Sequence, residues 1–291
     1  MTPVRRDWMF IDGSSLIFRA FHGVPSSVRA PDGRQVNAVR GFLETLTRLL
    51  TSRRPRHLAV ASDEDWRPAW RVELLPSYKA HRTAEPIPPD LEPQMELIHE
   101  YLDAIGIEFV GCPGYEAEDV ISSWTAATGG SVDVVSGDRD LFGLIEDPRV
   151  RVLYPEKGGL AEVDEAEVTR RYGIPGRRYA DFAVLRGDPS DGLPGLRGVG
   201  AVSAAAMINQ HGGLPGLIAA GGLTEAQREY VERALRVVQP VRGLPLAPPQ
   251  GRRAAYPADA AALVELTERN GLASTSERLV SALSAVLSPA S

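Results

Sequence analysis

Acidic residues recur in this sequence where short apolar runs end or where a helix begins. Asp12 and Asp63 follow two such runs, and Asp188 and Asp191 stand three residues apart in GDPSDGLPGLRGVG. Side chains at i and i+3 can point the same way in a helix or a tight turn. A lone aspartate after a strand is often only a turn or cap residue. The whole set is hard to explain in that way: Asp12, Asp63, Glu116, Glu118, Asp119, Asp138, Asp140, Asp188 and Asp191.

These nine carboxylates predict a site for divalent metal ions. In one cleft they cannot all stay ionised without cations, because neighbouring like charges raise each other's pKa. Oxygen ligands without histidine or cysteine select Mg²⁺ or Mn²⁺ over zinc. The acids are too many for one ion, and two ions about 3.5–4 Å apart suit in-line phosphodiester cleavage, where they activate a water and stabilise the leaving oxygen. No side chain then has to act as the nucleophile.

The elements that would position these acids alternate between strands and helices. Apolar runs predict strands at residues 8–11, 57–61, 107–110, 132–135 and 150–153, and helical spacing marks 36–50, 91–105, 117–124, 165–172 and 179–186. This order predicts an α/β protein with a mainly parallel central sheet flanked by helices, followed by a smaller helical part. Ligands collect at the carboxyl ends of strands in such sheets. The first seven acids fall there, and Asp188 and Asp191 would approach from the helical part.

Two further segments have the composition of a phosphate-binding surface. Gly195, Gly198 and Gly200 follow the last aspartate, and backbone N–H groups freed there can hold a phosphate together with the next helix N-terminus. Residues 66–89 are basic, interleaved with Trp70 and Tyr78, and broken by prolines. That segment is either a mobile basic element that contacts a phosphate backbone or an ordinary solvated loop.

The composition limits the class of protein. With 291 residues, 43% hydrophobic and 24% charged, the chain can form one large globular domain or two smaller ones. Cys112 is the single cysteine, which excludes an intrachain disulfide, and no apolar run approaches the roughly 20 residues of a membrane span. We expect a cytoplasmic protein, monomeric by default. The net charge of −6 argues mildly against a nucleic-acid partner, although an acidic metal site can sit beside a basic groove.

Five motifs make the sequence similar to the 5′-nuclease, or flap endonuclease, family, which includes the 5′→3′ exonuclease domain of bacterial DNA polymerase I and its stand-alone relatives. They are FIDGSSLIFRAFH (10–22), SYKAHR (77–82), GYEAEDV (114–120), SGDRDL (136–141) and GDPSDGLPGLRGVG (187–200). The resemblance covers nearly the whole chain. It implies a PIN-like 5′-nuclease fold, with a nuclease domain at 1–178, a helical arch at about 66–100, and a helix–hairpin–helix DNA-binding region at 179–291.

The resemblance also implies roles for the residues. The nine acids would hold two or more Mg²⁺ or Mn²⁺ ions, and Arg19, Lys79 and Arg82 would contact phosphate near the scissile bond. Gly195, Gly198 and Gly200 would grip duplex DNA, with a potassium ion on the hairpin carbonyls. The implied substrates are 5′ flaps, gapped or nicked duplexes and RNA-primed ends. We expect a separate polymerase and ligase to work beside this nuclease in primer removal and repair.

Four positions depart from the family pattern. Glu118 stands where aspartate is usual, Ser62 where phenylalanine is usual, Gly192 where asparagine is common, and Val202 where a lysine often follows the hairpin. None of these changes removes an acid. They put metal affinity and the grip on the duplex in question more than the class of reaction.

An alternative function is a DNA-binding paralogue that recognises flap structures but has weak or lost catalysis. Glu118, Gly192 and Val202 motivate it, and such a protein would bind a flap substrate yet leave it whole at high Mn²⁺. A phosphatase-type or nucleotide-binding enzyme is disfavoured. Gly13 follows Asp12 where an alternating acid would be needed, and the glycine run lies without a strand directly before it.

Overall fold

The computed structural model describes residues 5–83 and 87–287. Its centre is a six-stranded sheet of order β3-β2-β1-β4-β5-β6, in which only β6 runs antiparallel to its neighbour. The predicted α/β fold with a mainly parallel sheet is therefore confirmed. The strands are β1 (Trp8–Asp12), β2 (His57–Ala61), β3 (Phe109–Val110), β4 (Val132–Val135), β5 (Val150–Glu156) and β6 (Gly159–Val163). β6, a hairpin partner of β5, has no counterpart among the predicted strands.

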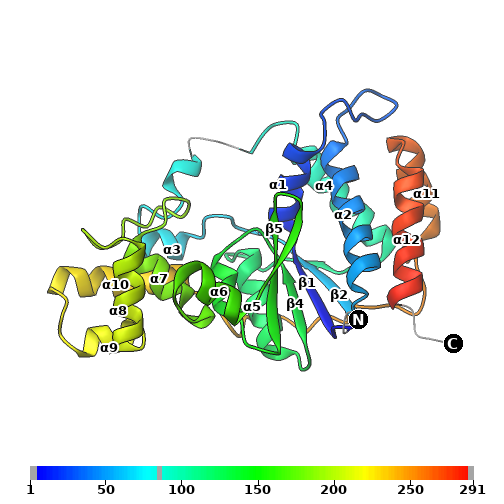
Figure 1. Cartoon of the computed structure of the whole chain (residues 1–291). Coiled ribbons are helices and arrows are strands. Elements are labelled where there is room, and N and C mark those ends of the chain that lie inside the picture. Colours follow the sequence, from blue (N-terminus) through cyan, green and yellow to red (C-terminus); the bar gives the residue numbers. More distant parts are fainter. Residues whose placement is uncertain (1–4, 84–86, 288–291) are drawn as a thin grey trace.

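Helices cover both faces of the sheet (Figure 1). They are α1 (Gly13–Gly23), α2 (Asn37–Arg53), α3 (Ala69–Leu74), α4 (Glu92–Ile105), α5 (Ala117–Ala127), α6 (Glu165–Tyr172), α7 (Tyr179–Arg186), α8 (Ala201–His211), α9 (Leu214–Ala219), α10 (Glu225–Val238), α11 (Ala260–Asn270) and α12 (Ala273–Leu287). The described residues also include short 3₁₀ turns: η1 (Ala80–Thr83) between α3 and α4, η2 (Asp140–Leu144) between β4 and β5, and η3 (Gly176–Arg178) between α6 and α7. Within the described ranges, no helix is long and apolar enough to cross a membrane.

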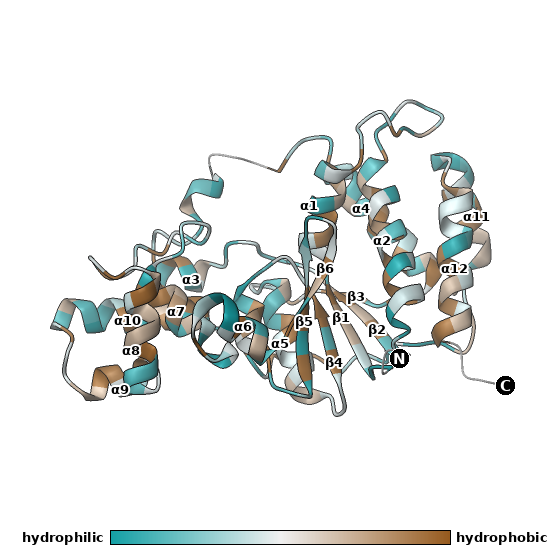
Figure 2. Ribbon diagram, in the orientation of Figure 1, coloured by the Kyte–Doolittle hydropathy of each residue, from teal (hydrophilic) through white to brown (hydrophobic). Residues whose placement is uncertain are grey.

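The pleat of the central strand divides the interior into two cores. Met9 and Ile11 of β1 face a core made with α1, α2, α4, α11 and α12, whereas Phe10 faces the other core with α5. Both faces of β1, β2 and β4 are therefore buried, which accounts for their nearly continuous apolar runs. Figure 2 shows these hydrophobic residues along the strands.

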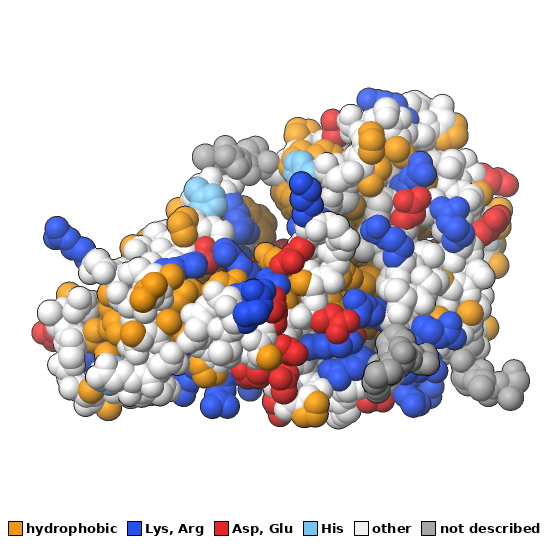
Figure 3. All heavy atoms as spheres, in the orientation of Figure 1, with side chains coloured by type: hydrophobic (Ala, Val, Ile, Leu, Met, Phe, Trp, Pro, Cys, Tyr) orange, Lys and Arg blue, Asp and Glu red, His pale blue; other side chains and the backbone are white. Residues whose placement is uncertain are grey.

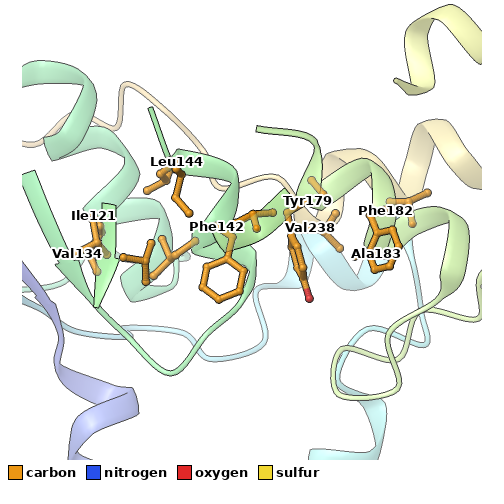
Figure 4. Close-up of a cluster of buried hydrophobic side chains, with 14 of the residues drawn as sticks. Ile121, Val134, Phe142, Leu144, Tyr179, Phe182, Ala183 and Val238 are labelled. Atoms are coloured by element: carbon orange, nitrogen blue, oxygen red, sulfur yellow. The ribbon is translucent and has the colours of Figure 1, made fainter. Parts of the chain in front are cut away.

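The second core runs without interruption from the sheet into the helical part. Figure 4 shows Val134 and Ile121 near the sheet, Phe142 in the middle, and Tyr179 and Phe182 of α7 at the far side. The predicted domain boundary at residue 178 thus crosses a continuous hydrophobic core, and the division stays a prediction. Within 179–291, α7 to α10 form the helical part, whereas α11 and α12 pack beside α2 and α4 on the opposite face.

The segment predicted as an arch at about 66–100 has several parts. α3 and η1 lie beside the helical part, and the chain then passes to α4, which packs on the sheet with α2 (Figure 1). Residues 84–86 lie outside the described ranges. From Glu92 onwards the segment therefore belongs to the helical layer on the sheet, and only the part before α4 stands apart from it.

Candidate metal centre

Three adjacent strands bring the first acids to one edge of the sheet. β1 lies between β2 and β4, so the carboxyl ends of these strands are neighbours, at the point where the strand order reverses. Asp12 ends β1 and caps α1 by accepting a hydrogen bond from the Ser15 amide at 2.9 Å. Its other oxygen accepts from Ser136 Oγ, which follows β4, at 2.5 Å.

The N-terminus of α5 adds a second group of acids. Asp63, just beyond β2, accepts a hydrogen bond from the Ala117 amide at 2.7 Å, which ties it to the first turn of α5. Glu116 is the N-cap of that helix, with Glu118 and Asp119 in its first turn. The orphan N–H groups and the dipole of the helix favour acids at this end. All three of these side chains are buried.

Glu118, Asp138 and Asp140 form the tightest cluster of possible ligands. One carboxylate oxygen from each lies within 4.8 Å of the other two. The Asp140 amide donates to Asp138 Oδ1 at 2.9 Å, which fixes the turn after β4. Glu118 Oε1 is buried and has no hydrogen-bond partner among the described residues, although the Arg71 guanidinium lies at 2.9 Å in a poor orientation. A buried oxygen left in that state suits a divalent cation.

Asp188 and Asp191 reach the same cluster from the turn after α7. Burial and then Asp138 raise the pKa of Asp191 to about 6. Burial and then Asp191 raise the pKa of Asp140 well above its usual value. Asp191 of the helical part therefore lies close to Asp138 and Asp140, which follow β4 of the sheet. Asp188 differs, because Arg139 and Arg186 each approach its Oδ2 at 3.3 Å.

The acids on the sheet side of the cluster also have raised pKa values. Burial, followed by the neighbouring Asp63, raises the pKa of Asp12 to about 7. Burial also raises the pKa of Asp63 and, well above its usual range, that of Glu118. Carboxylates with raised pKa values hold protons or bind cations. The residue set therefore fits divalent metal ions, with oxygen donors only.

Arg71 is a central residue that the sequence did not reveal. It is fully buried on α3, with Nη1 against Glu116 and Nη2 at 2.7 Å from Asp119. Sequence spacing placed it in a segment taken to be a mobile basic element or a solvated loop, and nothing in the spacing separates it from the nearby Arg67. Part of the acidic charge is therefore neutralised by an internal guanidinium, which the count of acids alone could not show.

Lys79 compensates the same glutamate. Its ammonium group contacts Glu116 and lies 3.9 Å from Asp191, and Tyr78 Oη donates to Glu116 at 2.7 Å. Burial alone would raise the pKa of Glu116, but Lys79 and Arg71 outweigh it and hold this pKa below its usual value. Lys79 has a left-handed backbone with φ of 45°, and its amide donates to the Asp191 carbonyl at 3.0 Å.

The other predicted phosphate contacts lie at the exposed side of the cluster. The Arg82 side chain is 42% exposed and 3.9 Å from Asp191. Arg19 is exposed on α1 beside Gly137. Figure 3 shows a hollow between the part with α8 to α10 and the part with α1 and α2, with Lys and Arg side chains on both of its sides.

The glycine hairpin joins α7 to α8. The Gly195 amide donates to Tyr230 Oη of α10 at 3.0 Å, and this hydroxyl donates to the Val184 carbonyl at 3.1 Å. Gly198 and Gly200 are exposed, with open space around them, and Gly200 caps α8. The hairpin thus presents its backbone outward, apart from the acids. Tyr230, which fixes it, was absent from the predicted site because no local pattern links α10 to the hairpin.

Gly192 allows the turn after α7 to approach residues 77–79 of the predicted arch closely. It has φ of 72°, and a Cβ atom built there would lie 1.9 Å from the Ser77 carbonyl oxygen. A side chain at this position would push residues 77–79 away from the turn that carries Asp188 and Asp191. The departure from the common asparagine is therefore matched to a close backbone approach.

Known proteins are similar to this chain in sequence and in fold. Residues 7–173 match the family model described as 5'-3' exonuclease, N-terminal resolvase-like domain. The chain is 49% identical over 302 residues to a 5'-3' exonuclease of Streptomyces coelicolor, covering 95% of this chain and 100% of that one. It is 45% identical over 314 residues to a 5'-3' exonuclease of Mycobacterium tuberculosis, covering 96% and 98%. It is 39% identical to DNA polymerase I of Mycobacterium bovis over 253 residues, or 82% of this chain and 28% of the polymerase.

Solved structures share the fold at low sequence identity. A bacteriophage T5 flap endonuclease in complex with DNA and metal ions has a TM-score of 0.65 and 18% identity, covering 97% of this chain and 99% of that one. Flap endonuclease-1 from Methanococcus jannaschii has a TM-score of 0.65 and 16% identity, covering 97% and 94%. At such identity these neighbours support the fold alone.

Proposed function

The chain belongs to the 5'-3' exonuclease family, and we propose that it hydrolyses DNA phosphodiesters as a structure-specific 5′→3′ exonuclease and 5′-flap endonuclease. The observation that carries this proposal is the convergence of acids from both parts of the chain: burial, with a further contribution from Asp138, raises the pKa of Asp12 at the end of β1 and that of Asp191 beyond α7.

The metal ions are assigned to the carboxylates that accept no hydrogen bond from an Arg or Lys side chain among the described residues, although Arg71 lies 2.9 Å from Glu118, and Lys79 and Arg82 lie 3.9 Å from Asp191. We propose that Glu118, Asp138 and Asp140 hold one ion and that a second is held nearby, with Asp12, Asp63 and Asp191 as the remaining sources of ligands. Mg²⁺ and Mn²⁺ suit an all-oxygen set. When bound, they supply Lewis acidity for activating water and stabilising a leaving oxygen. Glu116 pairs with Lys79, and Asp188 pairs with Arg139. These two acids therefore orient cationic side chains around the cluster.

The cationic side chains then position the substrate. Arg19 is exposed and Arg82 is partly exposed at the edge of the cluster, where a phosphate would neutralise them. Lys79 is buried and held by Glu116, and we assign its ammonium group to a phosphate oxygen of the bound strand. The exposed hairpin with Gly198 and Gly200 offers backbone N–H groups to the duplex, and we assign a potassium ion to its carbonyls.

The expected substrates are 5′ flaps, gapped or nicked duplexes and RNA-primed ends. We place residues 66–91 in the arch that passes the single-stranded 5′ end, 1–178 in the nuclease domain and 179–291 in the DNA-binding region. A cytoplasmic monomer that works beside a separate DNA polymerase and ligase fits primer removal and repair.

A labelled 5′-flap duplex tests the proposal directly. With Mg²⁺ or Mn²⁺ the wild-type protein should cut the flap, and Asp138→Ala should leave it whole. Equal nicking by both proteins would show that the assigned centre is wrong. The departures at Glu118, Gly192 and Val202 favour one second candidate, a flap-binding protein without efficient catalysis. That protein would shift the flap duplex in a gel and leave it intact at high Mn²⁺.

A further inference from the structure

Asp119 has a different environment from the other acids of the cluster. It is fully buried. Its Oδ1 accepts hydrogen bonds from Arg71 Nη2 and from the Val241 amide, both at 2.7 Å. Its Oδ2 accepts from the Glu116 amide at 3.2 Å, which completes the capping box of α5. Three donors from three segments of the chain therefore occupy both oxygens of this carboxylate.

The neighbouring Glu118, in contrast, has a carboxylate oxygen that accepts no hydrogen bond from the described residues. This oxygen, Oε1, lies 2.9 Å from the Arg71 guanidinium without forming a hydrogen bond to it, and the side chain belongs to the cluster with Asp138 and Asp140. Asp119 lies outside that cluster of possible ligands. To bind an ion through Oδ1 it would have to release Arg71 or the Val241 amide inside the protein, and an ion at Oδ2 would have to share that oxygen with the Glu116 amide of the capping box. A buried donor left without a partner is strongly unfavourable.

The Val241 contact connects the centre to a distant part of the chain. Residues 239–251, the strap, lead from α10 to the start of β2, where the Gly251 carbonyl accepts from the Leu58 amide at 2.7 Å. Ser123 of α5 also holds the strap: its Oγ donates to the Val241 carbonyl at 3.2 Å and accepts from the Leu244 amide at 3.1 Å. Asp119 is therefore the point where α3, α5 and the strap meet.

We propose that Asp119 is a positioning residue and not a metal ligand: it orients Arg71 against Glu116 and Glu118 and anchors the strap behind the centre. This inference rests on the proposed nuclease function for its kinetic test, but not for its structural one. It revises the role that the family resemblance implies for Asp119. The acids that hold metal are then those without a full set of internal donors.

A crystal of the wild-type protein grown with Mn²⁺ tests the ligand claim without any activity measurement. Anomalous scattering should place manganese within about 2.5 Å of oxygens of Glu118, Asp138 or Asp140. Both oxygens of Asp119 should still accept from Arg71, Val241 and Glu116. A manganese ion at ligand distance from Asp119 would overturn the inference and leave the nuclease proposal standing.

The kinetic test compares two buried aspartates. Asp119→Asn keeps the shape of the side chain but weakens its hold on Arg71, and the single-turnover rate of flap cleavage should fall about 10- to 100-fold, with little change in DNA affinity. Asp133 is equally buried and pairs with Arg6 and Arg151 away from the centre. Asp133→Asn should lower Tm comparably and leave the cleavage rate unchanged. Equal rates for the two variants would refute a positioning role.

A double-mutant cycle and a backbone variant complete the test. If Asp119 acts through Arg71, Asp119→Asn should add little to the rate loss already caused by Arg71→Lys; full additivity would contradict this. Should Asp119→Asn fail to fold, Val241→Pro removes the donor from the strap and leaves every carboxylate in place. It should also slow cleavage, and an unchanged rate would remove the strap from the argument.

Discussion

Gly192→Asn, which introduces the residue common in the family, should lower both the stability and the cleavage rate of this protein. The structure places the Cβ of any residue 192 at 1.9 Å from the Ser77 carbonyl oxygen, whereas real Cβ contacts essentially never fall below 3.0 Å. Residues 77–79 must therefore move by about 1 Å or more away from the turn. Asparagine accepts a left-handed backbone more readily than most residues, so this displacement is the main effect of Gly192→Asn.

The displacement acts on Lys79 and on stability together. It breaks the hydrogen bond from the Lys79 amide to the Asp191 carbonyl, which contributes about 1 kcal/mol. It also shifts the Lys79 ammonium group relative to Glu116 and Asp191. A misplacement of about 1 Å in a catalytic site can lower the rate roughly 100-fold, equivalent to about 2.7 kcal/mol of activation free energy.

Single-turnover cleavage of a 5′-flap duplex measures this effect. Gly221 provides the matched control, because its φ of 70° is close to the 72° of Gly192 while no atom of the described residues lies within 4 Å of its Cβ position. Gly221→Asn should therefore retain wild-type cleavage, and Gly192→Asn should cut roughly 100-fold more slowly. Equal rates for the two variants would refute the claim that Gly192 allows the arch to dock on the turn.

Four further predictions concern other parts of the site. Lys79→Ala or Arg82→Ala should slow cleavage and leave Mn²⁺ binding nearly intact by calorimetry; unchanged turnover in both would remove the arch assignment. Tyr230→Phe should weaken duplex binding several-fold in a fluorescence titration, because the Gly195 amide loses its acceptor, and unaltered affinity would show that the hairpin needs no support. The logarithm of DNA affinity should fall linearly with the logarithm of salt concentration, since phosphate contacts release counterions, and a flat response would contradict phosphate binding. Asp12→Asn should raise the free energy of unfolding of the metal-free protein by about 1–3 kcal/mol, measured with urea at pH 8. The pKa of Asp12 in the folded protein is about 7, above the usual 3.8. Ionised Asp12 therefore destabilises the wild-type fold increasingly from pH 4 to 7. No gain over wild type in EDTA would argue against that raised pKa.

The sequence predicted those parts of the site that depend on local pattern. β2 and β4 begin and end at the predicted residues, and β1 ends one residue later, at Asp12. Because these strands are largely apolar and each is followed by acids, the sheet edge could be inferred from the sequence alone. The family resemblance, drawn from the motifs around these acids, is confirmed by the family model and the 5'-3' exonuclease relatives.

Tertiary contacts that no local pattern encodes could not be predicted. Arg71 lies in a stretch with several arginines, and only packing against α5 makes it buried while Arg67 stays partly exposed. Tyr230 meets Gly195 across 35 residues of sequence. The placement of α12 beside α2 likewise depends on which of several amphipathic helices fills that face. In each case several chemically similar residues or helices could make the contact, and the sequence pattern does not distinguish them.

The two ends of the described chain meet at the side of the sheet that lies opposite the acids. Arg5, just before β1, donates to the Val286 carbonyl near the end of α12. Figure 1 shows the start of β1 and the end of α12 in that region. An affinity tag, a surface linker or a fused partner enzyme attached at either end would therefore point away from incoming DNA. Such attachments should leave substrate access free, which makes the protein suitable for immobilised assays.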